Sequence, residues 1–348
     1  NIPESVAGRL ENDLQSLMKR EKETWLVAQC RKVLEEASQW QRDYTDAPHY
    51  ENSSESYRQR WSQTIGEMRF DHNLNPQWEP FFENEKVVAR WLFIDLEEGL
   101  RARAVLALPK NGKPPLPLIV AQHGISSSPA NVFGFNNPTG LYHGYGLALL
   151  EQGFAVLAPA NITLARPRSR LHRLCLLLGT TLAGLEVGKL RRLLDYVVTL
   201  PEIDEDRIGM WGISLGGHYT MFTAPLEKRI KAAIVCAFFN DRLHKMALSS
   251  PLYSCFLDVE EEHIWIPGWF KGGFTDSNLL SLVCPRAVQI QQGRADGIGW
   301  WPLQEAEYQR LKAHYVKLEI EDRVEYAGHN WGHEIMVEEG IGFLRKWL

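Results

Sequence analysis

Gly212, Ser214 and Gly216 form a Gly-x-Ser-x-Gly pattern that could supply a nucleophile for acyl transfer. An apolar run precedes the pattern, and residues 215–222 can form a helix. In a nucleophile elbow, a strand turns sharply into a helix and the serine hydroxyl projects from a strained backbone. Flanking glycines suit this turn, because side chains there would clash with nearby backbone. The alternative is a glycine-rich turn with an incidental serine. The flanking elements and the partners described below favour a catalytic Ser214.

A serine hydroxyl needs a base to remove its proton, and an acidic residue must orient that base. After an elbow of this kind, the acid and then the histidine follow the serine along the chain. Asp296 follows the strand predicted at 287–291 and is the expected acid, although it could be a turn aspartate. Asp241, after the preceding strand, is the second candidate. His333 is the expected base because it directly precedes the final helix, whereas His329 is expected to be a supporting or substrate-facing residue.

His329, His333 and Glu334 could also suggest a metal site. However, a helical His-Glu-x-x-His motif has its glutamate between the two histidines. This stretch instead contains Gly328 and Gly332 and is predicted to be a loop. The sequence therefore predicts no metal and no other cofactor.

Two hydrogen-bond donors must stabilise the oxyanion of a tetrahedral intermediate. The backbone N–H of Leu215, directly after the nucleophile, is the first expected donor. The N–H of Ile125, in the loop after an early buried strand, is the second, with Gly124 allowing the backbone to approach. His123 precedes the serine in the chain, so it is expected to shape this loop and is a candidate substrate contact.

The elements that position these residues alternate between strands and helices. Period-two alternation at 100–108 predicts a strand in an antiparallel edge region, and the apolar run 118–121 predicts a parallel strand covered on both faces. Further strands are expected at 154–158, 232–237, 287–291 and 317–326, and helices at 141–152, 180–200, 302–314 and 335–348. This order predicts an α/β fold with a doubly wound, mostly parallel sheet.

Helical apolar spacing also marks the N-terminal region, at 26–37 and 57–68. We therefore expect a helical extension over 1–80 and a catalytic domain over 81–348, with an irregular insertion at 240–282 over the site. The helices are expected to pack against the main domain. A second subunit is the alternative, which would give a homo-oligomer through the N-terminal helices.

Composition narrows the partners. The net charge of −5 gives no nucleic-acid footprint, and no apolar run approaches the ~20 residues of a membrane helix. Five scattered cysteines, an odd number without metal spacing, favour buried thiols over a disulfide framework. The chain begins at Asn1, so either it was trimmed or a leader was removed. The compartment stays open between the cytoplasm and the periplasm or exterior.

The sequence resembles the α/β-hydrolase superfamily, and within it the dienelactone-hydrolase-like and acetyl-xylan-esterase-like serine esterases of bacteria, over residues 85–348. Besides the elbow, the resemblance is carried by the stretches 122–124, 195–204, 206–209, 282–286 and 332–334. It implies the α/β-hydrolase fold and hydrolysis of a carboxylic ester through an acyl-serine intermediate, without a cofactor. In such families the Gly-His-Glu near the C-terminus supplies the base, which favours His333.

The substrate is indicated more weakly. Several of the 12 tryptophans fall in loops expected above the sheet, where they could stack on a sugar ring, line an acyl pocket or simply pack: Trp265, Trp269, Trp300, Trp301 and Trp331. Of these, Trp265, Trp300 and Trp331 are the expected substrate contacts. Arg166, Arg168 and Arg170 are expected to form a solvated face or to recognise an acidic group. We expect an esterified, for example acetylated, carbohydrate or a related small ester.

Two other functions are open. A prolyl-oligopeptidase-like serine peptidase usually carries a propeller domain, and the residues before the main domain are too few to build one. A non-catalytic α/β-hydrolase-fold binding protein would be signalled by loss of a catalytic residue, yet all three are present in order.

Overall fold

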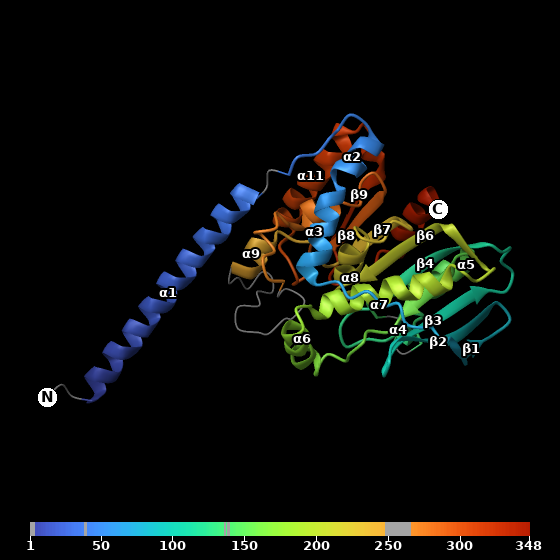
Figure 1. Cartoon of the computed structure of the whole chain (residues 1–348), viewed down its shortest axis with the longest axis horizontal. Coiled ribbons are helices and arrows are strands. Elements are labelled where there is room, and N and C mark those ends of the chain that lie inside the picture. Colours follow the sequence, from blue (N-terminus) through green and yellow to red (C-terminus); the bar gives the residue numbers. More distant parts are fainter. Residues whose placement is uncertain (1–3, 38–39, 136, 138–139, 248–265) are drawn as a thin grey trace.

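The computed structural model describes residues 4–37, 40–135, 137, 140–247 and 266–348 (Figure 1). The strands are β1 (Gln77–Glu83), β2 (Val87–Glu97), β3 (Leu100–Pro109), β4 (Leu116–Gln122), β5 (Ala155–Pro159), β6 (Ile203–Ile213), β7 (Ile230–Cys236), β8 (Ala287–Gly293) and β9 (Val324–His329). The helices are α1 (Glu4–Ala37), α2 (Ala47–Ser53), α3 (Glu55–Ile65), α4 (Pro129–Val132), α5 (Tyr145–Glu151), α6 (Arg168–Leu177), α7 (Leu182–Val197), α8 (Leu215–Thr223), α9 (Arg242–Ala247), α10 (Asp276–Leu280), α11 (Trp301–Lys317) and α12 (Val337–Trp347).

In the described part of the chain, the strands form one nine-stranded sheet in the order β1-β2-β3-β5-β4-β6-β7-β8-β9. The β1–β2, β2–β3 and β3–β5 pairs are antiparallel, whereas β5, β4 and β6 to β9 run parallel to one another. This confirms the predicted α/β architecture with its antiparallel edge. Since β6, β7, β8 and β9 are successive neighbours, the loops after them gather at one edge of the sheet.

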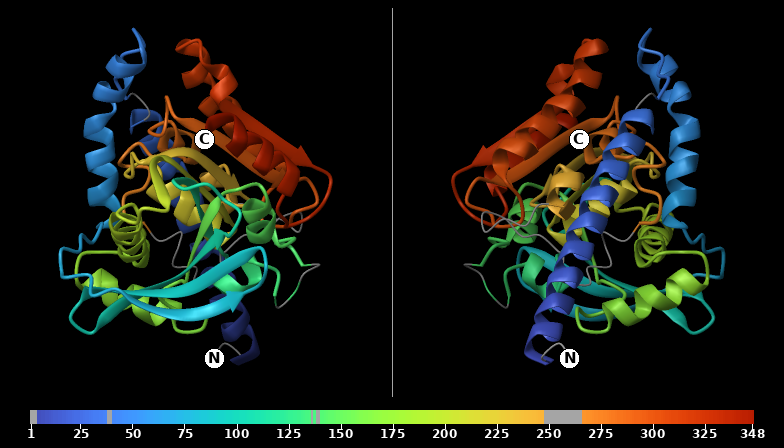
Figure 2. Two further views of the ribbon diagram at one scale, coloured as in Figure 1. Left: turned by 90° about the vertical axis from the view of Figure 1, so that its right-hand side faces the viewer. Right: turned by 90° about the vertical axis from the view of Figure 1, so that its left-hand side faces the viewer.

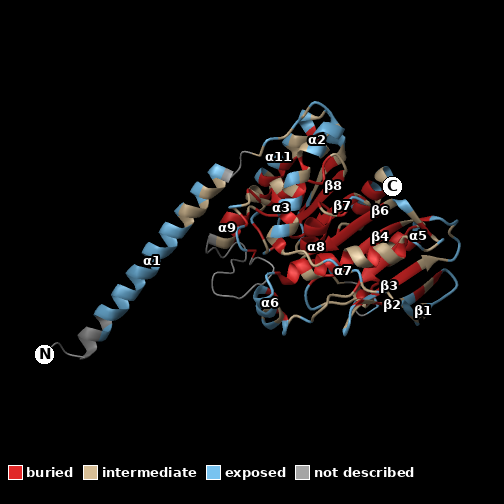
Figure 3. Ribbon diagram, viewed as in Figure 1, coloured by how far each residue is buried: buried red, intermediate tan, exposed pale blue. Residues whose placement is uncertain are grey.

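The central strands are buried on both faces, as Figure 3 shows for the middle of the molecule. On β4, Leu118 and Val120 join the apolar cluster on one face, while Ile119 and Ala121 join the cluster on the other. Successive side chains of a strand point to opposite faces, so a strand covered on both sides must be apolar throughout. The apolar run 118–121 is therefore a parallel strand covered on both faces, as predicted.

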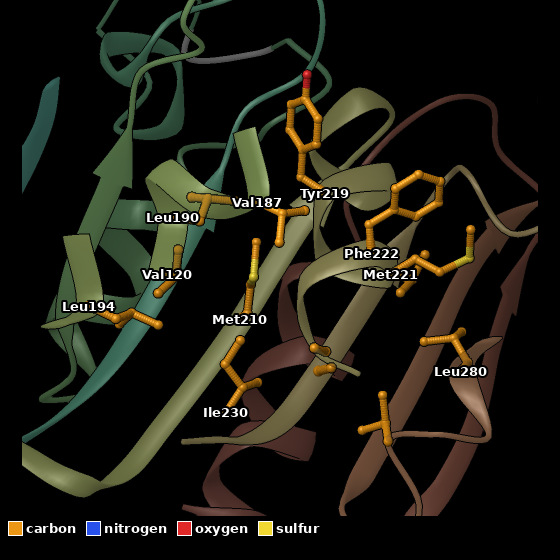
Figure 4. Packing of buried hydrophobic residues seen from close by; sticks show 14 of the residues in the cluster. Val120, Val187, Leu190, Leu194, Met210, Tyr219, Met221, Phe222, Ile230 and Leu280 are labelled. Carbon is orange, nitrogen blue, oxygen red and sulfur yellow. The ribbon is translucent and has the colours of Figure 1, made fainter. Parts of the chain in front are cut away.

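Helices cover the two faces unequally. The larger cluster contains side chains of α2, α3, α7, α8, α10 and α11, and the smaller one those of α4, α5 and α12. In Figure 4, Val187 and Leu190 of α7 lie over Val120 and Met210 of the sheet. The helix α7 begins at an N-cap, Thr181, whose side chain accepts a hydrogen bond from a first-turn N–H.

The boundary predicted at residues 80 and 81 differs from the structure, because it cuts through β1 and because α2 and α3 belong to the main core. Tyr50 and Trp61 are fully buried, and the Trp61 indole N–H donates to the carbonyl of Phe222 at 3.1 Å. The aromatic rings of Trp61 and Phe222 also meet edge to face. Packing against the main domain is thus confirmed for the 57–68 stripe. Residues 40–76 are therefore part of the main body of the molecule.

The helix α1 instead projects away from the body in Figure 1, and in the side views of Figure 2 it overlaps the body. It contacts α9, and in the 26–37 stripe Cys30, Val33 and Leu34 are half-buried while Leu26 remains 55% exposed, so the expected packing of this stripe is confirmed only in part. Toward the N-terminus a second apolar stripe lies open, with Leu10, Leu14 and Trp25 each more than half exposed. Among the helices of the described residues, none is long and apolar enough to cross a membrane.

Two other predictions need correction. The strand expected over 317–326 starts only at Val324, because α11 continues to Lys317 and the N–H of Ile320 turns back to the carbonyl of Tyr315. The insertion predicted as irregular over 240–282 contains α9 and α10. Its residues 248–265 lie outside the described residues.

Candidate active site

Ser214 stands between β6 and α8 on the sharp turn that the sequence predicts. Its φ of 59° and ψ of −121° lie outside the regions that non-glycine residues favour. Strain of this kind costs on the order of 1–3 kcal/mol and tends to be retained at functional sites. The Ser214 N–H donates to the carbonyl of Cys236 at 2.9 Å, which fixes the turn. A Cβ at Gly216 would lie 2.1 Å from the carbonyl oxygen of Gln122, so this position needs glycine.

The structure brings Asp296 and His333 together, in the loops after β8 and β9. Nδ1 of His333 lies 2.8 Å from Oδ2 of Asp296. The carboxylate, 4% exposed, also accepts hydrogen bonds from the Ile298 N–H at 2.9 Å and the Gln292 side chain at 3.3 Å. An ionised carboxylate only accepts, so we assign the proton to Nδ1, which leaves Nε2 of His333 free to accept one.

Cys236, at the end of β7, connects this pair with the elbow. Its carbonyl accepts the Ser214 N–H, and its thiol lies 3.4 Å from the carbonyl of Glu334, the residue after His333. Complete burial raises the pKa of the Cys236 thiol well above its ordinary value, and the charges of Asp296 and Glu334 add to this. The thiol therefore stays protonated and packs between the two loops.

The alternative acid, Asp241, and the alternative base, His329, do not form such a carboxylate–histidine pair with each other. The Asp241 carboxylate lies 2.9 Å from Nδ1 of His244 and 3.6 Å from the guanidinium of Arg310. His329 is 8% exposed, its ring lies 5.7 Å from that of Trp331, and both ring nitrogens lack a hydrogen-bond partner among the described residues. Burial lowers the pKa of His329, so its ring is neutral. The geometry thus pairs Asp296 with His333.

The two expected oxyanion donors belong to two segments that adjoin Ser214. Leu215 is the first residue of α8, and Ile125 follows Gly124 in the loop after β4. A Cβ on Gly124 would lie 3.3 Å from Cβ of Ser214, so this loop passes directly against Ser214. The N–H of Gly124 already donates to the hydroxyl of Tyr142 at 2.9 Å. Ile125 therefore remains the predicted second donor.

His123 is buried, which corrects its expected role as a substrate contact. Its Nδ1 lies 2.8 Å from the carbonyl of Gly124, and its Nε2 accepts the Asn161 N–H at 3.3 Å. Burial lowers the pKa of His123 to about 4, and both ring nitrogens are used within the protein. His123 therefore holds the loop that carries Gly124 and Ile125, as its place before Ser214 in the chain suggested.

Asn161 is a residue that the sequence interpretation missed. Its side chain donates to the carbonyl of Gly124 at 3.3 Å and accepts from the Gln122 amide at 2.9 Å. It follows β5, whose end lies beside that of β4. A polar residue just after a buried strand is the signal that could have drawn attention to it, because strand ends at one sheet edge meet.

A buried ion pair on α7 braces the loop that carries Asn161. Glu186 and Lys189 contact each other and are both fully buried. Glu186 accepts the N–H of Ile162 at 2.7 Å, and Lys189 donates to the carbonyl of Ala160 at 2.7 Å. Burial lowers the pKa of Lys189, and the Glu186 charge opposes this shift. Since both charges also hold backbone groups, they fix the loop on either side of Asn161.

The arginines expected on a solvated face divide. Arg166 and Arg170 are exposed, whereas Arg168 on α6 is 2% exposed and donates to the hydroxyl of Tyr219 at 2.9 Å. Tyr219 lies on α8, five residues after Ser214. Arg168 is therefore part of the packing behind the nucleophile helix, and the solvated-face prediction is wrong for it.

The tryptophans also divide. Trp331, 59% exposed, lies in the same loop as His333, and Trp300, 41% exposed, precedes α11. Trp269 is 8% exposed and packs edge to face against Trp61, so it belongs to the core. Trp265 lies outside the described residues. Exposed tryptophan rings are thus present in the two loops that carry Asp296 and His333.

Comparison with known proteins agrees with this fold. The acetyl xylan esterase (AXE1) family matches residues 189–256, which include the elbow. YtaP of Bacillus subtilis (strain 168), described by name as a hydrolase, is 25% identical over 282 residues, which are 76% of this chain and 90% of that protein.

Solved structures of similar fold include several esterases. A Bacteroides fragilis NCTC 9343 protein that carries the name acetyl xylan esterase has a TM-score of 0.74 at 15% identity, covering 93% of this chain and 94% of that one. Acetyl xylan esterase 1 of Thermoanaerobacterium sp. JW/SL YS485 has a TM-score of 0.59 at 19% identity, covering 91% and 98%. The glucuronoyl esterase of Solibacter usitatus reaches 0.62 at 12% identity, covering 86% and 94%.

The chain therefore has the α/β-hydrolase fold. Within that superfamily, the resemblance to the acetyl-xylan-esterase-like enzymes is confirmed.

Proposed function

We propose that this protein is a serine carboxylic-ester hydrolase that acts through an acyl-serine intermediate on acetylated or otherwise esterified carbohydrate. The observation that carries the proposal is the 2.8 Å contact between Asp296 and His333 at the sheet edge that also bears the strained Ser214. The names of the similar proteins, acetyl xylan esterase and glucuronoyl esterase, support an ester of a sugar as the substrate.

The residues have complementary roles in the reaction. Nε2 of His333 takes the proton of the Ser214 hydroxyl as its oxygen attacks the ester carbonyl carbon. The N–H groups of Leu215 and Ile125 stabilise the oxyanion, and His333 returns the proton to the departing alcohol. Water then attacks the acyl-serine with His333 again as base, which releases the carboxylic acid and restores Ser214. Asp296 holds the imidazole in the required tautomer.

Trp331 and Trp300 support a carbohydrate substrate because exposed aromatic faces can stack on the apolar face of a sugar ring. Both stand in loops that flank the acid–base pair. The sugar would then occupy the alcohol side of the ester, with the small acyl group against the oxyanion loop.

A substrate comparison tests the proposal. Acetylated xylo-oligosaccharide, p-nitrophenyl acetate, a methyl ester of glucuronic acid and a peptide anilide would be offered to the parent and to Ser214→Ala. The parent should hydrolyse the acetylated sugar with the highest kcat/KM, and Ser214→Ala should be inert at an unchanged melting temperature. Faster turnover of the anilide would indicate the peptidase. Sugar binding without hydrolysis of any ester would indicate a binding protein.

A further inference from the structure

Segment 141–143 touches both catalytic loops, although it lies in neither. On one side, the hydroxyl of Tyr142 accepts the N–H of Gly124 at 2.9 Å. Gly124 directly precedes Ile125, the predicted oxyanion donor, and lies against Ser214. Burial raises the pKa of the Tyr142 phenol, and the hydrogen bonds with the Ser127 side chain and the Gly124 backbone oppose this shift, so the hydroxyl stays protonated. Tyr142 thus fixes the loop that carries Ile125 at Gly124, the second residue after β4.

On the other side, the same segment holds the loop of the base. The carbonyl of Leu141 accepts the N–H of Ile335 at 2.9 Å. Nε2 of His143 lies 2.7 Å from a carboxylate oxygen of Glu334, the residue directly after His333. One backbone contact and one side-chain contact therefore restrain the two residues that follow the base.

The backbone of the segment turns left-handed where the two sets of contacts meet. His143 has a φ of 50°, in the left-handed region that His, Asn and Asp adopt more often than other non-glycine residues. Its N–H donates to the carbonyl of Gly140, and Tyr145 turns back to the carbonyl of Tyr142. This conformation sends neighbouring side chains in different directions, Tyr142 inward to the oxyanion loop and His143 outward to Glu334.

We infer that segment 141–143 is a clamp that sets the distance between the oxyanion loop and the base loop, with Tyr142 and His143 as positioning residues for the reaction. The inference rests on the proposed function for its chemistry. Neither side chain touches a reacting atom. Each holds a loop whose displacement by about 1 Å would cost on the order of 100-fold in rate.

A contribution to folding stability would not by itself explain the contact between His143 and Glu334. The His143 and Glu334 side chains are 38% and 26% exposed, and ion pairs this open contribute little to the free energy of folding. Removing the pair should thus leave the fold intact and let the base loop move. The Tyr142 hydroxyl can be removed without changing the ring that packs in the core.

The test uses Tyr142→Phe, His143→Asn and the double variant, since asparagine tolerates the left-handed backbone but is too short to reach Glu334. Two matched controls lie away from the site. Tyr50→Phe removes a buried hydroxyl that donates to the carbonyl of Ser281 at 2.9 Å, and His49→Asn removes an equally short contact, 2.7 Å, with Asp46. Each protein would be measured for kcat and KM with p-nitrophenyl acetate, for inhibition by phenylboronic acid and for melting temperature.

Each clamp variant should lose about 10- to 100-fold in kcat, with KM within about threefold of the parent. Phenylboronic acid, whose tetrahedral adduct resembles the intermediate, should bind more weakly in proportion. Melting temperatures should match those of the controls. The double variant should fall no further than the more damaging single variant, because both contacts act through one segment. Variants that behave like the controls, or losses that multiply in the double variant, would overturn the clamp.

A second readout separates this inference from the proposed function. The proton on Nδ1 of His333, hydrogen-bonded to Asp296, gives a far-downfield resonance in the proton NMR spectrum. If the parent hydrolyses no ester, the proposed function fails and the clamp is judged on this resonance. A shift or loss of the signal in Tyr142→Phe and His143→Asn, and not in the controls, supports the clamp. An unchanged signal refutes it.

Discussion

Replacing Asp296 with asparagine changes a single atom and should nearly abolish catalysis. The Oδ1 atom accepts the Ile298 N–H at 2.9 Å, so the asparagine oxygen will keep that position and its NH2 group will face Nδ1 of His333. Two donors cannot face each other, so the imidazole must move its proton to Nε2 and can no longer accept the proton of Ser214. The expected loss is about 10³- to 10⁴-fold in kcat, or about 4–5.5 kcal/mol of transition-state stabilisation.

The assay is steady-state hydrolysis of p-nitrophenyl acetate with the melting temperature measured alongside. Asp241→Asn is the matched control, because Asp241 also follows a strand and also contacts a histidine, His244, at 2.9 Å. It should retain activity within about threefold, since nothing joins it to the base. The reasoning is refuted if Asp296→Asn keeps more than about a tenth of the parent activity, or if Asp241→Asn loses as much.

Other predictions follow from the same contacts. His333→Gln should be inactive while His329→Gln keeps most of its activity, and the reverse order would transfer the role of base. Because burial lowers the folded-state pKa of His123 to about 4 from 6.5, the unfolded chain gains a proton first as the pH falls. The free energy of unfolding, measured with guanidinium, should therefore drop by about 2.5 kcal/mol between pH 7.5 and 4.5 on this account, and less in His123→Gln; equal drops would contradict it. Trp61→Ala should cost about 3–5 kcal/mol in the same measurement, and a cost below about 1 would place α3 outside the core. We also propose that the exposed stripe of α1 joins two copies of the chain. Deleting residues 1–37 should then convert a dimer into a monomer in light scattering, with kcat unchanged. The same number of chains per particle before and after the deletion would exclude this.

The positions of the candidate catalytic residues could be predicted because these residues follow a rule of strand order. Ser214, Asp296 and His333 each follow a parallel strand, and parallel neighbours place their carboxyl ends at one edge. The residue types then limit the choice, since only a few serines, acids and histidines stand at such positions. Roles in catalysis remain predictions, whereas the proximity of Asp296 and His333 is a feature of the fold.

The supporting contacts could not be predicted in this way. Tyr142 and Asn161 reach Gly124 from loops 18 and 37 residues further along the chain, and nothing in their local sequence specifies that partner. Arg168 looked like a surface residue because charged neighbours surround it, yet it is buried against Tyr219. Contacts of this kind depend on how loops pack on one another, which periodicity and turn chemistry do not encode.

The strand predicted over 317–326 was wrong at its start, because an alternating pattern also occurs in the turn between α11 and β9. The residues after Lys317 alternate like a strand, but the N–H groups of Leu318 and Ile320 donate back to the carbonyl of Tyr315, so these residues form the turn that follows α11. The helix α3 was correctly read as amphipathic, but its partner could not be identified before Trp61 was found against Phe222. Local hydrogen bonds decided the first case, and a tertiary contact decided the second.

The most direct test of the central claim is to locate a covalent label. A fluorophosphonate reacts with a serine only when a neighbouring base and oxyanion donors activate it. Intact mass after labelling, followed by peptide mapping, should show one adduct on the parent, located at Ser214, and none on Ser214→Ala or His333→Gln. An unlabelled parent, or an adduct at any other residue, would contradict an acyl-serine mechanism at this site.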